Sequence, residues 1–233
     1  MVEILKGIEI LDLSLYLKKY KTLIISDLHL GIEDSLIDQG ILIPKNQFKI
    51  IKNKIDSLIQ TRIVKTIVLN GDIKHELSRI NKQEWEDIDL LLNSFNKLKI
   101  VLIFGNHDII MMNILKNKGY YAKKFIEFGD IVILHGDIIP IEVYNKKVII
   151  IGHEHPSIIL TEGAKSEKFK CFIKGKWKEK TLIVMPSFNP LTEGTNVLNF
   201  KFLSPFIKSD IKNFNVYIVG DKIYNFGKIK NLA

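Results

Sequence analysis

Histidine side chains in this chain stand close to aspartate, asparagine or glycine, just after short apolar runs. All six histidines follow this pattern. The five motifs are Asp27-Leu28-His29, Gly71-Asp72 with His75 three residues later, Gly105-Asn106-His107-Asp108, His135-Gly136-Asp137 and Gly152-His153-Glu154-His155. On an extended backbone, residues i and i+2 point to the same side, so each pair can present two donors to one cation.

The donor atoms of these motifs favour a centre with two cations. Nitrogen or oxygen donors, and no sulfur, come from Asp27, His29, Asp72, Asn106, His135, His153 and His155. Such a set suits Mn²⁺, Fe or Zn²⁺ better than Ca²⁺ or Cu(I). Seven donors are too many for one tetrahedral ion but suit two ions that share a carboxylate, an arrangement found in hydrolytic sites. Each motif alone is weak, but five in this order are not a coincidence of surface histidines.

Buried strands must position these motifs. Five apolar runs lead directly into them, at residues 22–26, 66–70, 99–104, 131–134 and 148–151. Near-continuous apolar runs of this length are typical of strands buried on both faces. Ligands of open α/β sheets bind at the carboxyl ends of such strands, so we expect the motifs to meet at one rim.

Helical patterns separate the first three runs, which predicts an α/β fold. Pro44 can open a helix whose apolar face contains Phe48, Ile51, Ile55, Leu58 and Ile59, and a second apolar face contains Ile88, Leu91, Leu92 and Phe95. Further strands are expected at 3–5, 8–11, 171–173, 181–185, 216–219 and 222–224, with a turn at Gly220-Asp221. No repeat or linker divides the chain, so residues 1–233 are interpreted as a single domain.

Composition points to a globular protein with a cytoplasmic location. The 233 residues are 46% hydrophobic and 26% charged, which is ordinary for a globular domain. We expect no membrane association, because no apolar run is long enough to span a bilayer and no signal-peptide pattern opens the chain. Cys171 is the only cysteine, which favours a reducing compartment. The net charge of +8 fits a phosphate-rich partner such as nucleic acid, or a lysine-rich composition alone.

The motif order resembles that of the calcineurin-like metallophosphoesterase superfamily. The segments DLHLG, NGDIKHE, FGNHD, LHGD and GHEH carry the resemblance over residues 27 to 155. It implies a four-layer α/β/β/α sandwich of two mixed sheets flanked by helices. It also implies that Asp27, His29 and His155 hold one metal, that Asn106, His135 and His153 hold the other, and that Asp72 bridges them.

Three further residues have expected catalytic roles. The resemblance implies that His107 is the catalytic histidine, near the leaving group and not on a metal. Asp108 either orients His107 or caps the helix that follows. His75 either contacts the phosphate as a second histidine or only packs at a helix start.

Finer motifs resemble the DNA-repair nuclease branch of the superfamily. Phosphoprotein phosphatases typically carry GDxxDRG, whereas this chain has GDIKHE with no arginine near Asp72. The segments 40–44 (GILIP) and 185–194 (MPSFNPLTEG) resemble the bacterial and archaeal phosphoesterases associated with DNA ligase. That family implies manganese-dependent phosphodiesterase and DNA endonuclease activity. Residues 185–194 are then expected to wall the site; the other interpretation is a proline-bounded loop with a buried Phe188.

The sequence therefore predicts a phosphodiesterase or endonuclease that processes DNA with two divalent ions. Mn²⁺ is the expected metal, with Fe, Zn²⁺ and Mg²⁺ as alternatives, and DNA-repair proteins are possible partners. A small-molecule phosphoesterase, for example on cyclic nucleotides, has the same fold and site and stays open as an alternative. A non-catalytic module is disfavoured, because such relatives lose metal ligands and none is missing here.

Overall fold

Two β-sheets lie face to face at the centre of the computed structural model, which describes residues 2–199, 201–208 and 211–232. The first sheet has the strand order β1-β2-β3-β4-β5-β6-β7, antiparallel from β1 to β4 and parallel from β4 to β7. Its strands are β1 (Val2–Leu5), β2 (Ile8–Leu11), β3 (Ser14–Leu17), β4 (Thr22–Ser26), β5 (Thr66–Asn70), β6 (Lys99–Ile103) and β7 (Ala122–Lys123).

The second sheet is also mixed. Its main path is β14-β11-β12-β13-β10-β9-β8, and β15 and β16 join it through β12. Strands β9, β10 and β13 are parallel to one another, and β8, β12 and β15 run against their neighbours. The strands are β8 (Phe125–Phe128), β9 (Ile131–Leu134), β10 (Val148–Ile151), β11 (Pro156–Glu162), β12 (Lys165–Trp177), β13 (Lys180–Val184), β14 (Thr195–Asn196), β15 (Asn215–Val219) and β16 (Ile223–Lys228).

The central strands are buried on both faces because each face meets a different layer. In β4, Ile24 packs in the core between the sheets with Ile133 of β9 and Ile150 of β10. Its neighbours Leu23 and Ile25 point the other way, into the core under the helices. This explains why the site-bearing strands are continuous apolar runs and not alternating ones.

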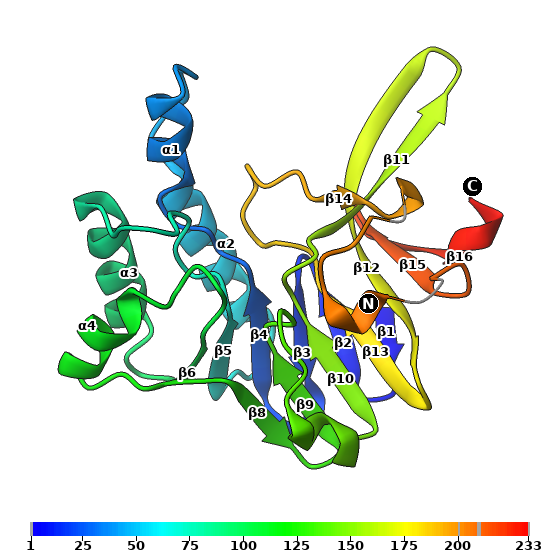
Figure 1. The fold of residues 1–233 in the computed structure, drawn as a ribbon, viewed down its shortest axis with the longest axis horizontal. Helices are drawn as coiled ribbons and strands as arrows, with labels where there is room; N and C mark the ends of the chain where they lie inside the picture. The colour runs from blue at the N-terminus through cyan, green and yellow to red at the C-terminus, as the bar shows by residue number, and fades with distance from the viewer. Residues whose placement is uncertain (1, 200, 209–210, 233) are drawn as a thin grey trace.

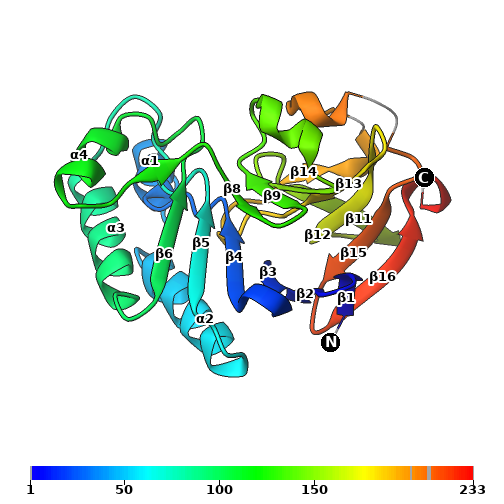
Figure 2. The ribbon, with the colours of Figure 1, turned by 90° about the horizontal axis from the view of Figure 1, so that it is seen from below.

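Helices cover the outer faces of both sheets (Figures 1 and 2). Helices α2 (Gln47–Thr61), α3 (Lys82–Ser94) and α4 (Met111–Asn117) pack on the first sheet, whereas α1 (Ile32–Asp38) lies clear of the sheet, above α2 in Figure 1. The 3-10 helices are η1 (Lys18–Tyr20), η2 (Ile141–Asn145), η3 (Val197–Asn199), η4 (Pro205–Ile207) and η5 (Ile229–Asn231). All of these except η1 contribute to the core on the outer face of the second sheet. The expected α/β sandwich of two mixed sheets is confirmed, with short 3-10 helices in its fourth layer. Within the described ranges, no helix has the length and apolarity needed to cross a bilayer.

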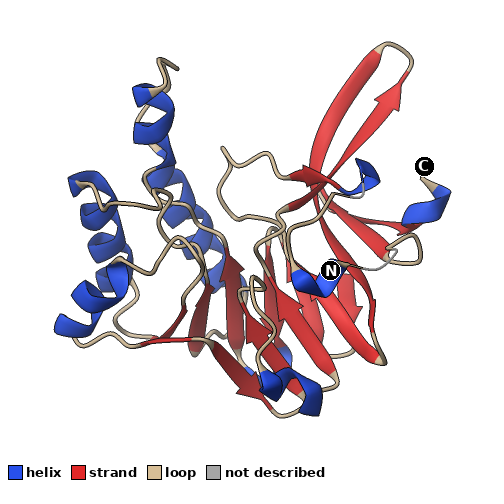
Figure 3. Cartoon of the chain, in the orientation of Figure 1, coloured by secondary structure: helices blue, strands red, loops and turns tan. Residues whose placement is uncertain are grey.

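Two local expectations need correction. Helix α2 begins at Gln47 and not at Pro44, because the Glu33 carboxylate accepts a hydrogen bond from the Gln47 backbone N–H at 2.9 Å and so satisfies the helix start. The expected strand at 171–173 is only the middle of β12. With β11 it forms a long hairpin that projects from the body of the protein (Figure 3).

Candidate metal centre

The five motifs meet at one edge of the molecule, where parallel strands of both sheets end. The motif residues follow β4, β5 and β6 of the first sheet and β9 and β10 of the second. Because the two sheets face each other, their strand ends bring the side chains together from both sides.

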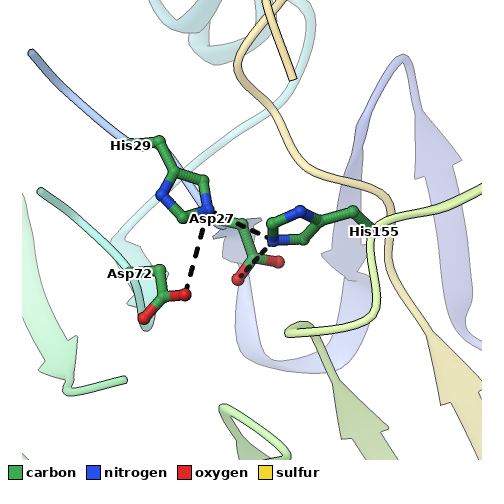
Figure 4. A group of neighbouring side chains, drawn as sticks. All are labelled: Asp27, His29, Asp72 and His155. Carbon is green, nitrogen blue, oxygen red and sulfur yellow. Dashed lines mark hydrogen bonds and ion pairs between the residues drawn. The ribbon is translucent and has the colours of Figure 1, made fainter. Parts of the chain in front are cut away.

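Four of the candidate ligands form a first group, consisting of Asp27, His29, Asp72 and His155. One donor atom of each lies within 4.8 Å of the donors of the others (Figure 4). The Nε2 atoms of His29 and His155 are 3.2 Å apart. His155 Nε2 is 3.4 Å from Asp27 Oδ1, and His29 Nε2 is 3.8 Å from Asp72 Oδ2.

A second group consists of Asp72, His135 and His153, again within 4.8 Å. His135 Nε2 lies 3.4 Å from Asp72 Oδ1 and 3.0 Å from His153 Nδ1. Asn106 joins this group, with its Oδ1 3.1 Å from His135 Nε2. Asp72 therefore turns one carboxylate oxygen toward each group.

The chemistry of the two groups fits divalent cations. Burial lowers the pKa of His29 and of His135 well below the usual value, so both imidazoles are neutral and can donate a lone pair. Burial, together with the nearby Asp27 and Asp108 carboxylates, raises the pKa of Asp72 far above its usual range. A carboxylate in such a place is ionised only beside a cation, so the residues present fit a two-cation centre.

Left-handed backbone is concentrated at the candidate ligands. Eight non-glycine residues of the described chain have positive φ, and five of them are candidate ligands. These five are Asp27 (55°), His29 (43°), Asp72 (46°), His153 (67°) and His155 (45°). The extended backbone assumed from the i, i+2 spacing is therefore wrong. L-residues hold this conformation only where their surroundings impose it, which occurs preferentially at functional sites.

Two motif glycines are required by the closeness of the carboxylates. A Cβ on Gly105 would overlap Oδ1 of Asp72, and a Cβ on Gly152 would overlap Oδ2 of Asp27. Only glycine lets the backbone that carries Asn106 and His153 pass so near these side chains.

Comparison with known families agrees with this geometry. The family model for the calcineurin-like phosphoesterases matches residues 20–220. The chain belongs to the calcineurin-like phosphoesterase family. It is accordingly a metal-dependent phosphoesterase, and thus a hydrolase.

The fold of this calcineurin-like phosphoesterase also occurs in a solved structure. The nuclease MPE of Pseudomonas putida aligns with a TM-score of 0.65 and 17% identity, over 91% of each chain. A predicted phosphoesterase from Streptococcus pneumoniae aligns with a TM-score of 0.35 and 16% identity, over 89% of this chain and 97% of that one. Comparison with curated proteins gives no match to this sequence.

Two further histidines of the phosphoesterase lie beside the ligands. The Nδ1 atom of His107 is hydrogen-bonded to the backbone carbonyl of His75, and its Nε2 is 3.8 Å from Asp72 Oδ2. The His75 ring stacks 6.0 Å from the His107 ring and meets the His29 ring edge-on at 5.4 Å. The structure thus brings both residues to the centre.

Asp108 makes different contacts from the two that the sequence suggested. Its buried carboxylate accepts hydrogen bonds from the backbone N–H groups of Gly105, Ile73 and Lys74. Helix α4 starts after Ile110, with no side-chain cap. Asp108 therefore joins the loop after β5 to the loop after β6, because three backbone donors surround it.

Sequence reasoning missed the contacts of residues 187–189, which follow β13. Ser187 Oγ–H donates to the Asp27 carbonyl at 2.7 Å, and Asn189 Nδ2–H donates to the Leu28 carbonyl at 2.7 Å. Phe188 is fully buried in the core under the helices. The sequence signals were the resemblance of residues 185–194 to a family segment and their position after a strand, and neither signal indicates which carbonyls these residues bind.

Proposed function

We propose that this phosphoesterase hydrolyses phosphodiester bonds in DNA with two divalent cations, Mn²⁺ by preference. The observation that carries the proposal is the position of Asp72, whose two oxygens face two separate groups of nitrogen and oxygen donors. The fold shared with a nuclease supports nucleic acid as the substrate. The net charge of +8 is consistent with a polyanion.

Each group has its own ligands in this proposal. Asp27, His29 and His155 would hold the first cation, Asn106, His135 and His153 would hold the second, and Asp72 would serve both. When bound, the two cations stabilise charge on the phosphoryl oxygens and activate water for attack. The mixed nitrogen and oxygen donors favour Mn²⁺, and also suit Fe or Zn²⁺ better than Mg²⁺.

His107 is assigned the proton transfer to the leaving group. If Nδ1–H donates to the His75 carbonyl, Nε2 is left facing the centre. In the imidazolium form, which carries a second proton on Nε2, His107 can deliver that proton to the departing alkoxide of a sugar and return to the neutral ring. His75, which lies beside His107, is assigned a contact with the phosphate.

The motif after β5 supports a diester substrate. Residues 71–76 (GDIKHE) contain no arginine, and arginine is the side chain that best clamps a terminal phosphate dianion through two parallel hydrogen bonds. A diester carries only one negative charge and does not require that clamp.

A substrate panel with Mn²⁺-loaded protein tests the proposal. The panel contains a bis-aryl phosphodiester, an aryl phosphomonoester, cyclic nucleotides, and single- and double-stranded DNA. We expect the diester to exceed the monoester in kcat/KM and DNA to be cleaved. A higher kcat/KM for the monoester would overturn the diester assignment. Cleavage of cyclic nucleotides without DNA would replace DNA by a small-molecule substrate.

Three wider features belong to the same proposal. The continuous core between the sheets supports residues 1–233 as one domain. The unpaired, buried thiol of Cys171 is consistent with a cytoplasmic location. Association with DNA-repair proteins follows from the proposed substrate, and co-purification of such proteins with the tagged enzyme tests it.

A further inference from the structure

A lysine of the second sheet lies behind the segment that supports the first group. Lys170 of β12 is partly buried, and its Nζ donates to the carbonyl of Ser187 at 2.8 Å and to the carbonyl of Asn189. Both acceptors are uncharged. Burial, with a contribution from the charge of Lys54, lowers the pKa of Lys170 to about 7. In the part of the chain that the structure describes, the hydrogen bonds of the Lys170 ammonium group go to the backbone of residues 187–189 and to no carboxylate.

Residues 187–189 in turn donate hydrogen bonds to four consecutive backbone carbonyls, those of residues 26–29, a segment that includes Asp27 and His29. Phe188 N–H donates to the Ser26 carbonyl at 2.9 Å, and Ser187 Oγ–H donates to the Asp27 carbonyl at 2.7 Å. Asn189 Nδ2 donates to the carbonyls of both Leu28 and His29, at 2.7 and 3.1 Å. The side chains of Ser187 and Asn189 are buried, so water does not replace these contacts.

The same stretch continues to the third ligand of the first cation. Thr195 N–H donates to the His155 carbonyl at 2.9 Å, and a Cβ on Gly194 would overlap that carbonyl oxygen. Residues 187–195 thus contact the backbone of Asp27, His29 and His155, the three ligands proposed for the first cation alone. Among the described residues, no hydrogen bond joins this stretch to Asn106, His135 or His153.

This asymmetry matters because the backbone of the first group is unfavourable on its own. Asp27, His29 and His155 all have left-handed φ, a conformation that persists only when neighbouring contacts impose it. For Asp27 and His29, those contacts are the hydrogen bonds that their carbonyls accept from residues 187–189, together with the bonds of their N–H groups to the Gly71 and Asp72 carbonyls.

We propose that Lys170 is a positioning residue for the first cation, acting through Ser187 and Asn189 on the backbone of Asp27 and His29. The inference rests on the two-cation site proposed above. It assigns Lys170 a larger effect on the first cation, because in the described chain this stretch reaches the second group only indirectly, through the Asp27 carboxylate that accepts the His153 N–H. Outer contacts of this kind typically change metal affinity by about 10- to 100-fold.

Calorimetric titration of the chelator-treated protein with MnCl₂ tests the inference. Lys170→Met keeps the length of the side chain but removes its donors. We expect one of the two Mn²⁺ affinities to fall by about 10-fold or more, with the other within about threefold of wild type. Lys170→Arg keeps N–H donors at this position and should therefore lose much less Mn²⁺ affinity than Lys170→Met.

Lys174→Met is the matched control. Lys174 lies on the same strand, is also partly buried, and donates to a backbone carbonyl, that of Ile4, at 2.6 Å. Its loss should lower the melting temperature but leave both Mn²⁺ affinities unchanged. Equal effects of the two substitutions on Mn²⁺ binding would reduce Lys170 to a general stabilising role and overturn the inference.

Ser187→Ala provides an independent measurement if Lys170→Met does not fold. It removes one hydrogen bond to the Asp27 carbonyl, and we expect it to weaken the same Mn²⁺ site by a smaller factor. If this variant, or folded Lys170→Met, bound both Mn²⁺ ions with wild-type affinity, the inference about Lys170 would be wrong. The proposed two-cation site would still stand. Failure of the wild-type protein to bind two Mn²⁺ would instead disprove the proposed two-cation site.

Discussion

Asp72 is the residue on which both groups depend, because its two oxygens point in different directions. We predict that Asp72→Ala abolishes phosphodiesterase activity and lowers the metal content below two ions per chain. Elemental analysis of the purified variant, after removal of free metal, measures the content. Two tightly held ions in this variant would show that Asp72 is not the bridge. Glu76→Gln, a change to a carboxylate four residues further along the chain, is the control.

His107 separates proton transfer from metal binding. A nitrophenolate leaves without a proton, whereas the alkoxide of a DNA sugar leaves poorly without one. We therefore predict that His107→Ala keeps both metals and loses on the order of 10²–10⁴-fold in the rate with DNA, but much less with an activated aryl phosphodiester. Metal content and single-turnover rates on both substrates are the measurements.

Comparison with two other histidines sharpens this test. His153→Ala should lose metal and fail with both substrates, since it removes a ligand. His75→Ala should follow His107→Ala with a weaker effect. An equal loss on both substrates in His107→Ala, with metal still bound, would exclude a role at the leaving group and assign His107 to substrate positioning.

Acidic side chains of α1 act electrostatically on α3, where the pKa of Asp87 is raised. Burial, with the nearby Glu33 and Asp34, raises its pKa to about 6, although Gln83 donates a hydrogen bond to it. The folded state therefore holds a proton that the unfolded state releases at lower pH, so its stability is lost as pH rises through about 6. We predict that Asp87→Asn raises the free energy of unfolding at pH 7.5 by on the order of 1–3 kcal/mol.

Denaturant unfolding at two pH values measures this effect. At pH 4 the difference between Asp87→Asn and wild type should vanish, because Asp87 is then protonated. Glu86→Gln, on the exposed side of the same helix, removes only a minor charge that acts on Asp87 and should show a much smaller pH dependence. A constant difference at both pH values would mean that Asp87 acts through packing and not through its charge.

The strands that carry the site could be predicted because burial on both faces gives an unambiguous apolar run. The runs at 22–26, 66–70, 131–134 and 148–151 coincide with β4, β5, β9 and β10, and 99–104 exceeds β6 by one residue. The hairpin of β11 and β12 was not predicted, because its outer part is largely exposed and its sequence has no clear alternation. Helices α1 and α4, of seven residues each, are too short for a helical period to show.

The metal ligands could also be predicted, but the residues that hold their backbone in place could not. Asp27 and His29 are rare donor types at a strand end, and so they are visible in the sequence. Ser187, Asn189 and Lys170 act through hydrogen bonds to backbone carbonyls, and such contacts leave no residue pattern. Left-handed φ at the ligands also depends on those distant contacts and is invisible in the motif itself.

At the scale of the whole molecule, the net charge of +8 tests the choice between DNA and a small phosphodiester. If lysines contact several phosphates, we predict that the affinity for DNA falls on the order of 10²-fold between 50 and 200 mM salt. The KM for an aryl phosphodiester should change little, since that substrate has one charge. Fluorescence anisotropy with His107→Ala, in which DNA cleavage is expected to be strongly slowed, measures DNA binding. Salt-independent binding would show that the charge is only compositional.

Each of the two ligand groups contains residues from both sheets. The metal centre can therefore form only after both sheets have folded. The hydrogen bond from His153 N–H to Asp27 joins residues 126 apart in the chain, and neither sheet alone contains a complete group. Contacts of such long range form late in folding, after the cost of closing a large loop has been met. A nascent chain that ends before β9 therefore cannot capture either ion. Since a cation that binds only the native state stabilises it by mass action, metal uptake marks the completion of folding and makes it harder to reverse.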